Sequence, residues 1–278
     1  MTKCQNLYDF YNDIFEGVLA NTEELRKECY KIRYEVYCIE HSGYEDPAAF
    51  PDGCEHDEHD AHAVHALLRH RETGIFVGTV RLILHSIGSI TGIPPVYNLC
   101  SANGLVMPEA FPRQNIAEVS RFCIIRDFRR RVVDTIASSS YTKDELLSDK
   151  LRIVPSMSLG LIAMLVLMSK QNTIKQWCAE MEPFLIQLLS KLGIYFEPVG
   201  PLVEYHGKRQ ICYRPLDALL NQVAKERLDV WEIITDRGRY CGDSKMEAFP
   251  FNGRGFEEAE DSMMDQSLSG KRDTSRLG

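Results

Sequence analysis

Residues 117–125 read Ala-Glu-Val-Ser-Arg-Phe-Cys-Ile-Ile, an apolar run interrupted by a glutamate and an arginine. The β-branched and aromatic residues of this run are typical of a buried strand. In a regular strand Glu118, Ser120 and Phe122 share one face, and Arg121 lies on the other, because successive side chains alternate. Leaving either charge unpaired in a core would cost several kcal/mol. We therefore expect this strand to line a polar site or to pair its charges.

The segments on either side predict a mixed α/β domain. Before this strand we expect helices at 8–17 and 22–38, a loop at 43–60, and a hairpin of strands at 63–69 and 76–84. After it the pattern predicts a helix, a strand, a helix, two short strands and a last helix, at 155–170, 174–179 and 183–192, near Tyr195 and Ile211, and at 216–234. This order places helices around one central, mainly antiparallel sheet.

The composition is that of a globular protein, because 44% of the 278 residues are hydrophobic and 26% are charged. Collagens, coiled-coil rods and wholly disordered chains are thereby excluded. The net charge of −8 argues against a nucleic-acid partner. The dinucleotide motif GxGxxG and the phosphate-binding motif GxxxxGKS/T are missing, which argues against a dehydrogenase or kinase. We expect one domain over residues 1–240 and a flexible polar tail over 241–278.

The sequence predicts a cytoplasmic protein without a membrane span. Its longest apolar candidate, residues 159–168, falls short of the ~18 to 20 residues that cross a bilayer. Residues 1–10 lack the apolar core of a secretory signal. The nine cysteines are odd in number and show no CxxC spacing, so we expect reduced thiols.

Charged residues recur inside the segments expected to be structured. Arg33 lies on the second helix, four residues before Tyr37, and Asp57 and Asp60 precede the hairpin. Arg81 interrupts the apolar run of residues 77–84. With Glu118 and Arg121 these residues make three arginines and three carboxylates, which can neutralise one another. We expect Arg33, Asp57, Asp60 and Arg81 to form one paired cluster at the mouth of the hairpin.

This constellation resembles the acyl-homoserine-lactone synthases and the related N-acyl amino acid synthases. The shared pattern is Arg-x-x-x-aromatic, Asp-x-x-Asp, Gly-x-x-Arg-Leu and Glu-x-Ser-Arg-Phe, which begin here at Arg33, Asp57, Gly78 and Glu118. The resemblance covers roughly residues 22–215. The segments Arg-Tyr-Glu-Val-Tyr-Cys (33–38) and Asp-Glu-His-Asp (57–60) look most like the acyltransferase associated with the PEP-CTERM/exosortase system.

The resemblance implies a GNAT-like acyltransferase fold and the transfer of a long acyl chain from a thioester to an amine. The homoserine-lactone synthases carry a tryptophan soon after the first motif, where it helps to shape the S-adenosylmethionine site. This chain has Ser42-Gly43-Tyr44 there, and its two tryptophans are Trp177 and Trp231. We therefore expect the amine of an amino acid or similar acceptor. Homoserine-lactone synthesis and a non-catalytic lipid-binding module on the same fold are the alternatives.

Acyl transfer requires an amine that has lost its proton and a polarised thioester carbonyl. Glu118 is the candidate base, directly or through water, and a structural ion pair with Arg121 or Arg33 is its alternative. Arg33, Asp57, Asp60 and Arg81 are expected to position the acceptor, together with Tyr37, Ser120 and Arg121, and the alternative is a purely stabilising network. The resemblance also implies a β-bulge near Arg121, which would redirect a side chain and free backbone N–H groups for the carbonyl.

The run of residues 126–131 is the one basic cluster of an acidic protein. An acyl carrier protein is acidic and presents a phosphopantetheine arm, so Arg126, Arg129, Arg130 and Arg131 are expected to dock it. Phe122, Cys123 and Ile124 would line the path of the arm. The donor is then a carrier-bound thioester, with acyl-CoA or a simply solvated helix start as alternatives. No permanently bound cofactor is expected.

Two further interpretations compete with this one. His56, His59, His62 and His65 lie among acidic residues and Cys54, which suggests zinc. In a loop that leads into a strand His62 and His65 face opposite ways, so we expect no metal. Cys123 could serve as a nucleophile, but a buried thiol on a core strand is the commoner arrangement.

Overall fold

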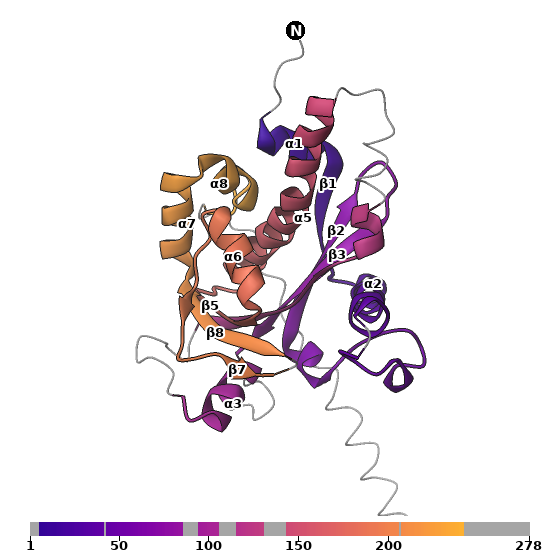
Figure 1. Cartoon of the computed structure of the whole chain (residues 1–278), viewed down its shortest axis with the longest axis vertical. Coiled ribbons are helices and arrows are strands. Elements are labelled where there is room, and N and C mark those ends of the chain that lie inside the picture. The colour runs from indigo at the N-terminus through magenta and orange to yellow at the C-terminus, as the bar shows by residue number, and fades with distance from the viewer. Residues whose placement is uncertain are drawn as a thin grey trace, which may run out of the picture. The chain divides into compact units, whose positions relative to one another are not determined.

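The computed structural model describes residues 6–41, 43–85, 94–105, 115–130, 143–205 and 207–241, and only the backbone of 143–152. The described part folds around a central sheet with helices on both faces (Figure 1). Arg131 and residues 242–278 of the expected tail lie outside the described residues.

Eight described strands form the sheet, in the order β1-β2-β3-β4-β5-β8-β6, with β7 paired to β8. They are β1 (Phe15–Leu19), β2 (Ala63–His70), β3 (Phe76–Leu84), β4 (Ile116–Ile124), β5 (Gln176–Met181), β6 (Glu197–Pro198), β7 (Val203–Glu204) and β8 (Lys208–Pro215). The β4–β5 pair is parallel, and the other pairs are antiparallel. The expected mixed, mainly antiparallel sheet is thus confirmed.

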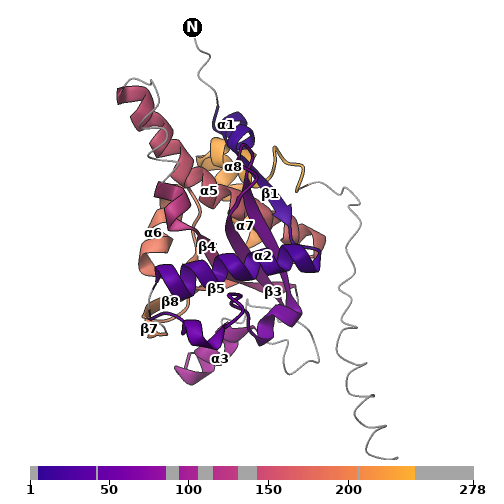
Figure 2. The ribbon, with the colours of Figure 1, turned by 90° about the vertical axis from the view of Figure 1, so that its right-hand side faces the viewer.

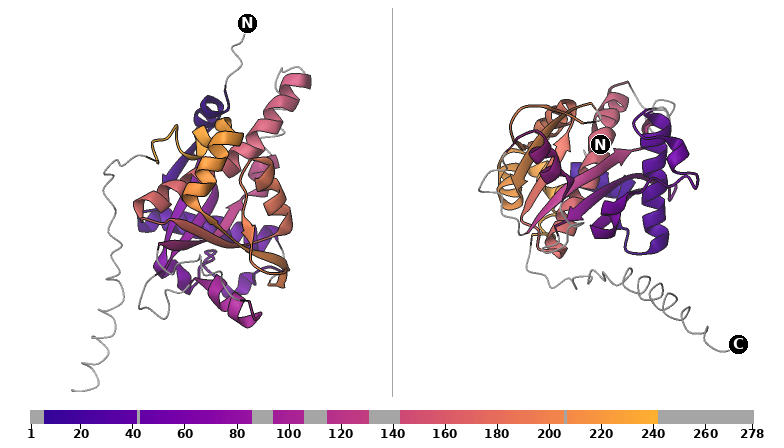
Figure 3. Two further views of the ribbon diagram at one scale, coloured as in Figure 1. Left: turned by 90° about the vertical axis from the view of Figure 1, so that its left-hand side faces the viewer. Right: turned by 90° about the horizontal axis from the view of Figure 1, so that it is seen from below.

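The helices cover the two faces of this sheet unequally. They are α1 (Leu7–Ile14), α2 (Glu23–Tyr34), α3 (Pro95–Ala102), α5 (Lys143–Gln171), α6 (Pro183–Lys191), α7 (Leu216–Glu226) and α8 (Leu228–Ile234). Helix α2 crosses β2–β4 on one face, and α5 packs against β1–β4 on the other (Figure 2). The view from below shows α2 and the pair α7–α8 on opposite sides of the strands (Figure 3). Each face of the central strands β2–β4 is thus covered by a long described helix.

Helix α2 begins as the sequence predicts. The hydroxyl of Thr22 accepts a hydrogen bond from the N–H of Leu25, and Glu23 and Glu24 lie in the first turn, where they suit the positive end of the helix dipole. A π-helical segment, Glu35–Glu40, continues it past Tyr34. Two 3-10 turns, Pro47–Ala49 and Glu58–His62, follow in the expected loop.

Several predicted boundaries are wrong, each because tertiary packing outweighs local pattern. The first helix ends at Ile14 rather than at residue 17, because the fully buried Phe15 starts β1 and pairs with His70. The expected last helix is two helices, which separate at Arg227. Helix α3 lies between β3 and β4, where no helix was expected, and α5 begins 12 residues before Pro155.

Helix α5 is the centre of the larger core. By length and composition its segment Ile153–Gln171 could cross a membrane, with mean hydropathy 1.8, so the expectation that no stretch is long enough was wrong. In the fold 83% of that segment is buried, because it packs against β1–β4 and α8. It therefore has the surroundings of a core helix.

Candidate active site

Strand β4 carries the β-bulge that the resemblance implied. Arg81 of β3 pairs with Ser120 and Thr79 pairs with Cys123, so two residues of β4 oppose one residue of β3. Arg121 has φ +50°, a left-handed conformation that is rare for a residue with a side chain. The bulge brings Arg121 and Ser120 onto the α2 face together, instead of on opposite faces as in a regular strand.

Beyond the bulge the alternation of β4 is reversed. Phe122 and Ile124 pack against the core around α5, whereas Cys123 joins the small core under α2. Burial raises the pKa of the Cys123 thiol to about 12, so at neutral pH it is not the thiolate that nucleophilic catalysis requires. The structure thus supports the reading of Cys123 as a buried thiol.

Strands β4 and β5 part just before the bulge. Their parallel pairing covers Ile116, Ala117 and Glu118, opposite Gln176, Trp177 and Cys178. From there β4 continues to Ile124 and pairs with β3, while β5 continues to Met181 and pairs with β8. The two strands are therefore not hydrogen-bonded to each other where the bulge lies, and the expected site residues gather beside this separation.

An ion-pair network lies on the α2 face at the separation. Three arginines from α2, β3 and β4 alternate with three carboxylates of the loop before β2. Arg33 binds Glu55 and, at 2.7 Å, Asp60. One nitrogen of Arg81 reaches Asp57 at 2.5 Å and Asp60 at 2.7 Å. The expected paired cluster at the mouth of the hairpin is confirmed.

Arg121 and Ser120 join the network from the bulge. Arg121 donates to Glu55 at 2.9 Å and to Asp57 at 3.1 Å, and Arg81 donates to the Ser120 hydroxyl at 3.0 Å. The guanidinium of Arg121 also lies 5.4 Å from the ring centre of Tyr37. Tyr37 stacks on Tyr44 with 5.1 Å between ring centres. The structure therefore brings all the expected substrate-positioning residues together.

The third carboxylate of the network is Glu55, a residue that the sequence analysis did not assign to it. We expected Glu118 to complete the charge balance, and this was wrong. Glu55 is the better partner because it lies between Arg33 and Arg121 and is buried with them. The sequence did offer a signal, since Glu55 lies in the same loop, two residues before the first aspartate of the Asp-x-x-Asp motif.

The network is closed at one end and open at the other. The side chains of Arg33, Glu55 and Arg81 are 0%, 1% and 2% exposed, whereas those of Arg121 and Asp57 are 18% and 26% exposed. Burial alone would raise the pKa of Glu55, but the hydrogen bonds and charges of Arg33 and Arg121 outweigh it and lower that pKa. The same competition lowers the pKa of Asp57 and Asp60. All three carboxylates are thus held ionised.

The two aspartates are fixed by their backbone as well. Asp57 caps the 3-10 turn by accepting the N–H of His59, and the N–H of Asp57 donates to Asp60 at 2.8 Å. This reciprocal cap explains the spacing of three residues in Asp-x-x-Asp. Each carboxylate then presents its remaining oxygens to the arginines.

Glu118 lies on the same face but outside this network. It is buried, and its Oε2 accepts a hydrogen bond of 2.8 Å from the N–H of Val96 at the start of α3. Among the described residues its partner is thus a backbone group rather than Arg121 or Arg33, and the expected ion-pair alternative is not what the structure shows. Burial, and then the charge of Glu180, raise the pKa of Glu118 well above its ordinary value.

Glu180 of β5 is a second carboxylate that the sequence analysis missed. It follows Cys178, the partner of Glu118, by two residues, so both glutamates lie on the same face of neighbouring strands. Its Oε1 is buried without a hydrogen-bond partner among the described residues. Burial raises the pKa of Glu180 to about 7. In the sequence it looked like one of several acidic residues near the end of a strand.

The basic run is divided between internal and exposed positions. The N–H groups of Arg126 and Asp127 donate to the Glu40 carboxylate at 2.7 and 3.3 Å, and the Arg126 guanidinium donates to the Glu40 carbonyl at 2.6 Å. Arg126 is thus occupied in holding the π-helical segment to the helical turn at 126–130. Arg129 and Arg130 are exposed, and the predicted docking surface rests on them among the described arginines.

The histidines of the loop do not meet as metal ligands in the described part of the chain, where no group of three His, Cys, Asp or Glu side chains is close enough to hold an ion. His65 is buried beside Asp60, 3.6 Å away, and burial lowers its pKa to about 3, so it is neutral. None of the eight described cysteines is in a disulfide bond.

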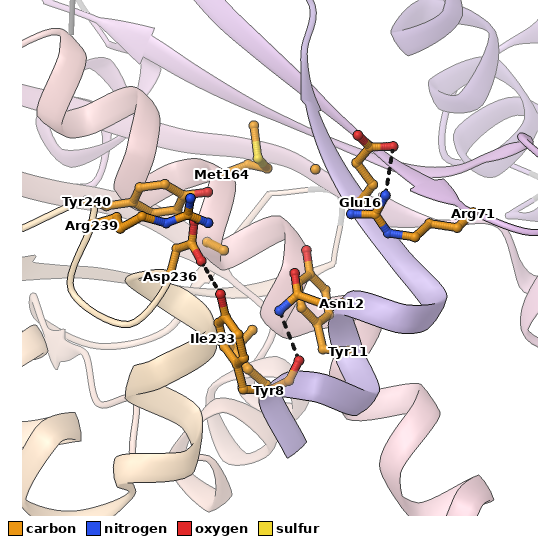
Figure 4. Close-up of a pocket in the computed structure, with 12 residues that line it drawn as sticks. Tyr8, Tyr11, Asn12, Glu16, Arg71, Met164, Ile233, Asp236, Arg239 and Tyr240 are labelled. Atoms are coloured by element: carbon orange, nitrogen blue, oxygen red, sulfur yellow. Dashed lines mark hydrogen bonds and ion pairs between the residues drawn. The ribbon is translucent and has the colours of Figure 1, made fainter. Parts of the chain in front are cut away.

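A cavity of about 160 Å³ lies away from these residues, between α1, β1, α5 and the end of α8. Figure 4 shows Tyr8, Asp236 and Tyr240 on one side of it and Glu16 and Arg71 on the other. Tyr8 donates to Asp236, and Glu16 pairs with Arg71 at 3.6 Å, so the charged groups that line it are paired with one another. None of the predicted site residues lines this cavity.

Comparisons with known proteins agree with the fold. Residues 32–138 match the model of the acetyltransferase (GNAT) domain. No curated protein sequence matches the chain.

Solved structures of similar fold include TofI in a ternary complex with an inhibitor and MTA, with 17% identity, 76% of this chain and 96% of that chain covered, and a TM-score of 0.51. BjaI with MTA, a CoA-dependent acyl-homoserine lactone synthase, shares 18% identity over 83% of this chain and 90% of that one, also with a TM-score of 0.51. FeeM, an N-acyl amino acid synthase from uncultured soil microbes, shares 17% identity over 75% and 95%, at a TM-score of 0.43.

The chain therefore has a GNAT-like fold, with a central mixed sheet flanked by helices, which is the fold that the sequence predicted and that BjaI shares.

Proposed function

We propose that this protein is an N-acyltransferase, which moves a long acyl chain from an acyl carrier protein to the amine of an amino acid or similar small acceptor. The observation that carries the proposal is the place of its polar groups. The ion-pair network, the buried Glu118 and the partly buried Glu180 lie on one face of the sheet, beside the separation of β4 and β5. A thioester entering there would meet a charged surface for the acceptor and a carboxylate for its proton.

The open end of the network fits an amino acid as acceptor. Asp57 and Arg121 keep exposed side-chain surface, and they carry opposite charges next to each other. Asp57 would hold the ammonium group and Arg121 the carboxylate. Arg33, Asp60 and Arg81 are buried, so we assign them to positioning these two side chains, with Tyr37 supporting the Arg121 guanidinium. In this assignment the exposed residues of the cluster bind the acceptor, and its buried residues stabilise them.

Glu118 is the proposed base. The acceptor ammonium must lose a proton before it can attack, and a buried carboxylate with a raised pKa binds a proton more strongly than a solvated one. The hydrogen bond from Val96 fixes the side chain in place. Glu118 would take the proton directly or through one water.

The donor is proposed to be a carrier-bound thioester. Arg129 and Arg130 are exposed next to the end of β4 and suit an acidic partner. The N–H groups at the start of their helical turn are already bonded to Glu40, which leaves them less suited to the pyrophosphate of CoA. The segments at 33–38 and 57–60 further suggest the kind of acyltransferase associated with the PEP-CTERM/exosortase system. A cytoplasmic location is proposed from the cysteine pattern, which is typical of reduced thiols.

The experiment is to incubate the protein with acyl carrier proteins of several chain lengths and a panel of amino acids, and to detect N-acyl products by mass spectrometry. Parallel reactions with acyl-CoA and with S-adenosylmethionine test the alternatives. Formation of an acyl-homoserine lactone instead of an N-acyl amino acid would replace the proposed acceptor. Lipid binding without turnover for any donor would favour the non-catalytic alternative.

The role of Glu118 is tested by Glu118→Gln. Removing a general base typically lowers turnover by ~10²- to 10⁴-fold, and we expect this with an unchanged melting temperature. The deficit should shrink at a pH where the acceptor amine is already deprotonated in solution. Glu197→Gln is the matched control, because Glu197 pairs with Arg214 near the protein surface. A lower melting temperature with normal turnover per folded molecule would make Glu118 structural.

A further inference from the structure

We infer that Glu180 is a positioning residue for the proposed reaction: it shares a proton with Glu118 and so sets the protonation state of the base. The inference rests on the proposed function, and it concerns a residue that none of the four sequence motifs contains. Glu180 would not touch the acceptor. It would act through the charge it places beside Glu118.

The sheet geometry makes the two glutamates neighbours. Glu118 is opposite Cys178 in the last registered pair of β4 and β5, and Glu180 is the next residue on the same face of β5. Helix α3 covers this face, as the bond from Val96 to Glu118 shows. Cys178 and Val96 pack together in the small apolar core on that side. The Glu118 side chain is therefore buried between the sheet and α3, and the Glu180 side chain beside it is partly exposed but has its Oε1 buried.

The two carboxyl groups have fewer hydrogen-bond donors than their oxygens can accept, so a proton shared between them would supply a missing donor. Glu118 has one backbone donor, from Val96, and Oε1 of Glu180 is buried without a partner among the described residues. A buried oxygen without a donor costs free energy, which a carboxyl proton held between the two groups would recover. Two carboxylates that share an apolar site do not both ionise easily, because each negative charge raises the cost of the other.

Other charged and titratable groups face the pair from several elements. The positive ones are Arg81 of β3, Arg121 of β4 and Arg209 of β8, and the neutral ones are Tyr205, Cys100, Cys178 and Cys212. The arginines favour ionisation, but Arg81 and Arg121 already neutralise Asp57, Asp60 and Glu55. Burial therefore prevails, and the pKa values of both glutamates are raised, that of Glu180 to about 7.

In the proposed reaction the Glu118–Glu180 pair accepts a proton from the acceptor. The pair starts with both carboxylates ionised, the acceptor enters as an ammonium ion, and the proton that it gives to Glu118 is the one that the two carboxyl groups then share. The neutral amine attacks the thioester carbonyl. As the carbon–sulfur bond breaks, the second nitrogen proton goes to the departing thiolate, which leaves as a thiol. The first proton is later released from the pair to solvent. A negative charge on Glu180 makes Glu118 the stronger proton acceptor in the first step.

The test compares wild type, Glu180→Gln and Glu118→Gln by infrared titration of buried carboxyl groups, with Glu197→Gln as control. In wild type two carboxyl protons should leave in separate steps, both at higher pH than ordinary glutamates. Glu118→Gln should keep the lower step and lose the upper one. Glu180→Gln should show a single step at least about one pH unit below the upper wild-type step, because the neighbouring charge is gone. Glu197→Gln should titrate as wild type does.

Activity supplies a second readout. The acid limb of kcat/KM should move to lower pH in Glu180→Gln, by the same amount as the titration, whereas a merely structural role would leave the limb in place. An upper step unchanged by Glu180→Gln, or one that persists in Glu118→Gln, overturns the inference. If wild type shows the paired titration but transfers no acyl group, the proposed function fails and the proton sharing stands. If wild type transfers acyl groups but the two glutamates titrate independently, the proposed function stands and the proton sharing fails.

Discussion

Glu55→Gln is the substitution that tests the ion-pair network most directly. Glutamine preserves the volume of the side chain and removes only its charge. Arg33 and Arg121 would then share Asp57 and Asp60 with Arg81, which leaves three positive charges facing two negative ones. Because Arg33 and Arg81 are buried, water cannot compensate for the missing charge.

Removing one partner of a buried ion pair typically costs ~3 to 5 kcal/mol of the free energy of unfolding. For a domain of this size a loss of that magnitude corresponds to a melting temperature lower by roughly 6 to 20 °C. The matched control is Glu28→Gln, which breaks the pair of Glu28 and Lys31 on the exposed surface of α2. Exposed pairs contribute at most about 1 kcal/mol, so the control should lose only a few degrees.

Urea unfolding of both variants and wild type across pH measures these differences. The pKa of Glu55 is lowered in the folded protein, so its stabilising contribution is present above the pKa of the unfolded chain and is lost as pH falls through the folded value. The stability gap between wild type and Glu55→Gln should therefore be full at about neutral pH and should narrow below about pH 4. Equal stabilities of Glu55→Gln and Glu28→Gln at neutral pH would refute the reasoning.

Two further outcomes are expected. Gly78→Ala should lower the free energy of unfolding by about 1 to 3 kcal/mol, as measured by chemical denaturation, because a Cβ there would lie 2.8 Å from the Cys123 carbonyl oxygen beside the bulge. A variant as stable as wild type would mean that β3 and β4 can move apart at this point without loss of stability. Arg129→Glu with Arg130→Glu should slow association with an acidic acyl carrier protein and flatten its dependence on salt, as followed by stopped-flow kinetics; an unchanged salt dependence would remove these arginines from the docking surface.

Much of the fold follows from local sequence. The hairpin at residues 63–84 and strand β4 alternate or cluster their apolar residues over lengths typical of strands, and Thr22 marks the start of α2. Three arginines and paired aspartates inside such segments predicted a cluster, because unpaired charges there would be too costly. The cluster exists, on the elements from which it was predicted.

The partners within that cluster, by contrast, were decided by tertiary structure. The bulge turns Arg121 to the α2 face, where Glu55 rather than Glu118 meets it, and a shift of one residue in register cannot be read from alternation alone. Glu180 lies 62 residues after Glu118, and only the parallel pairing of β4 with β5 makes them neighbours. Sequence determines which charged residues must be paired, because burying an unpaired charge is costly. The register of strands that are distant in the sequence determines which residue each of them pairs with.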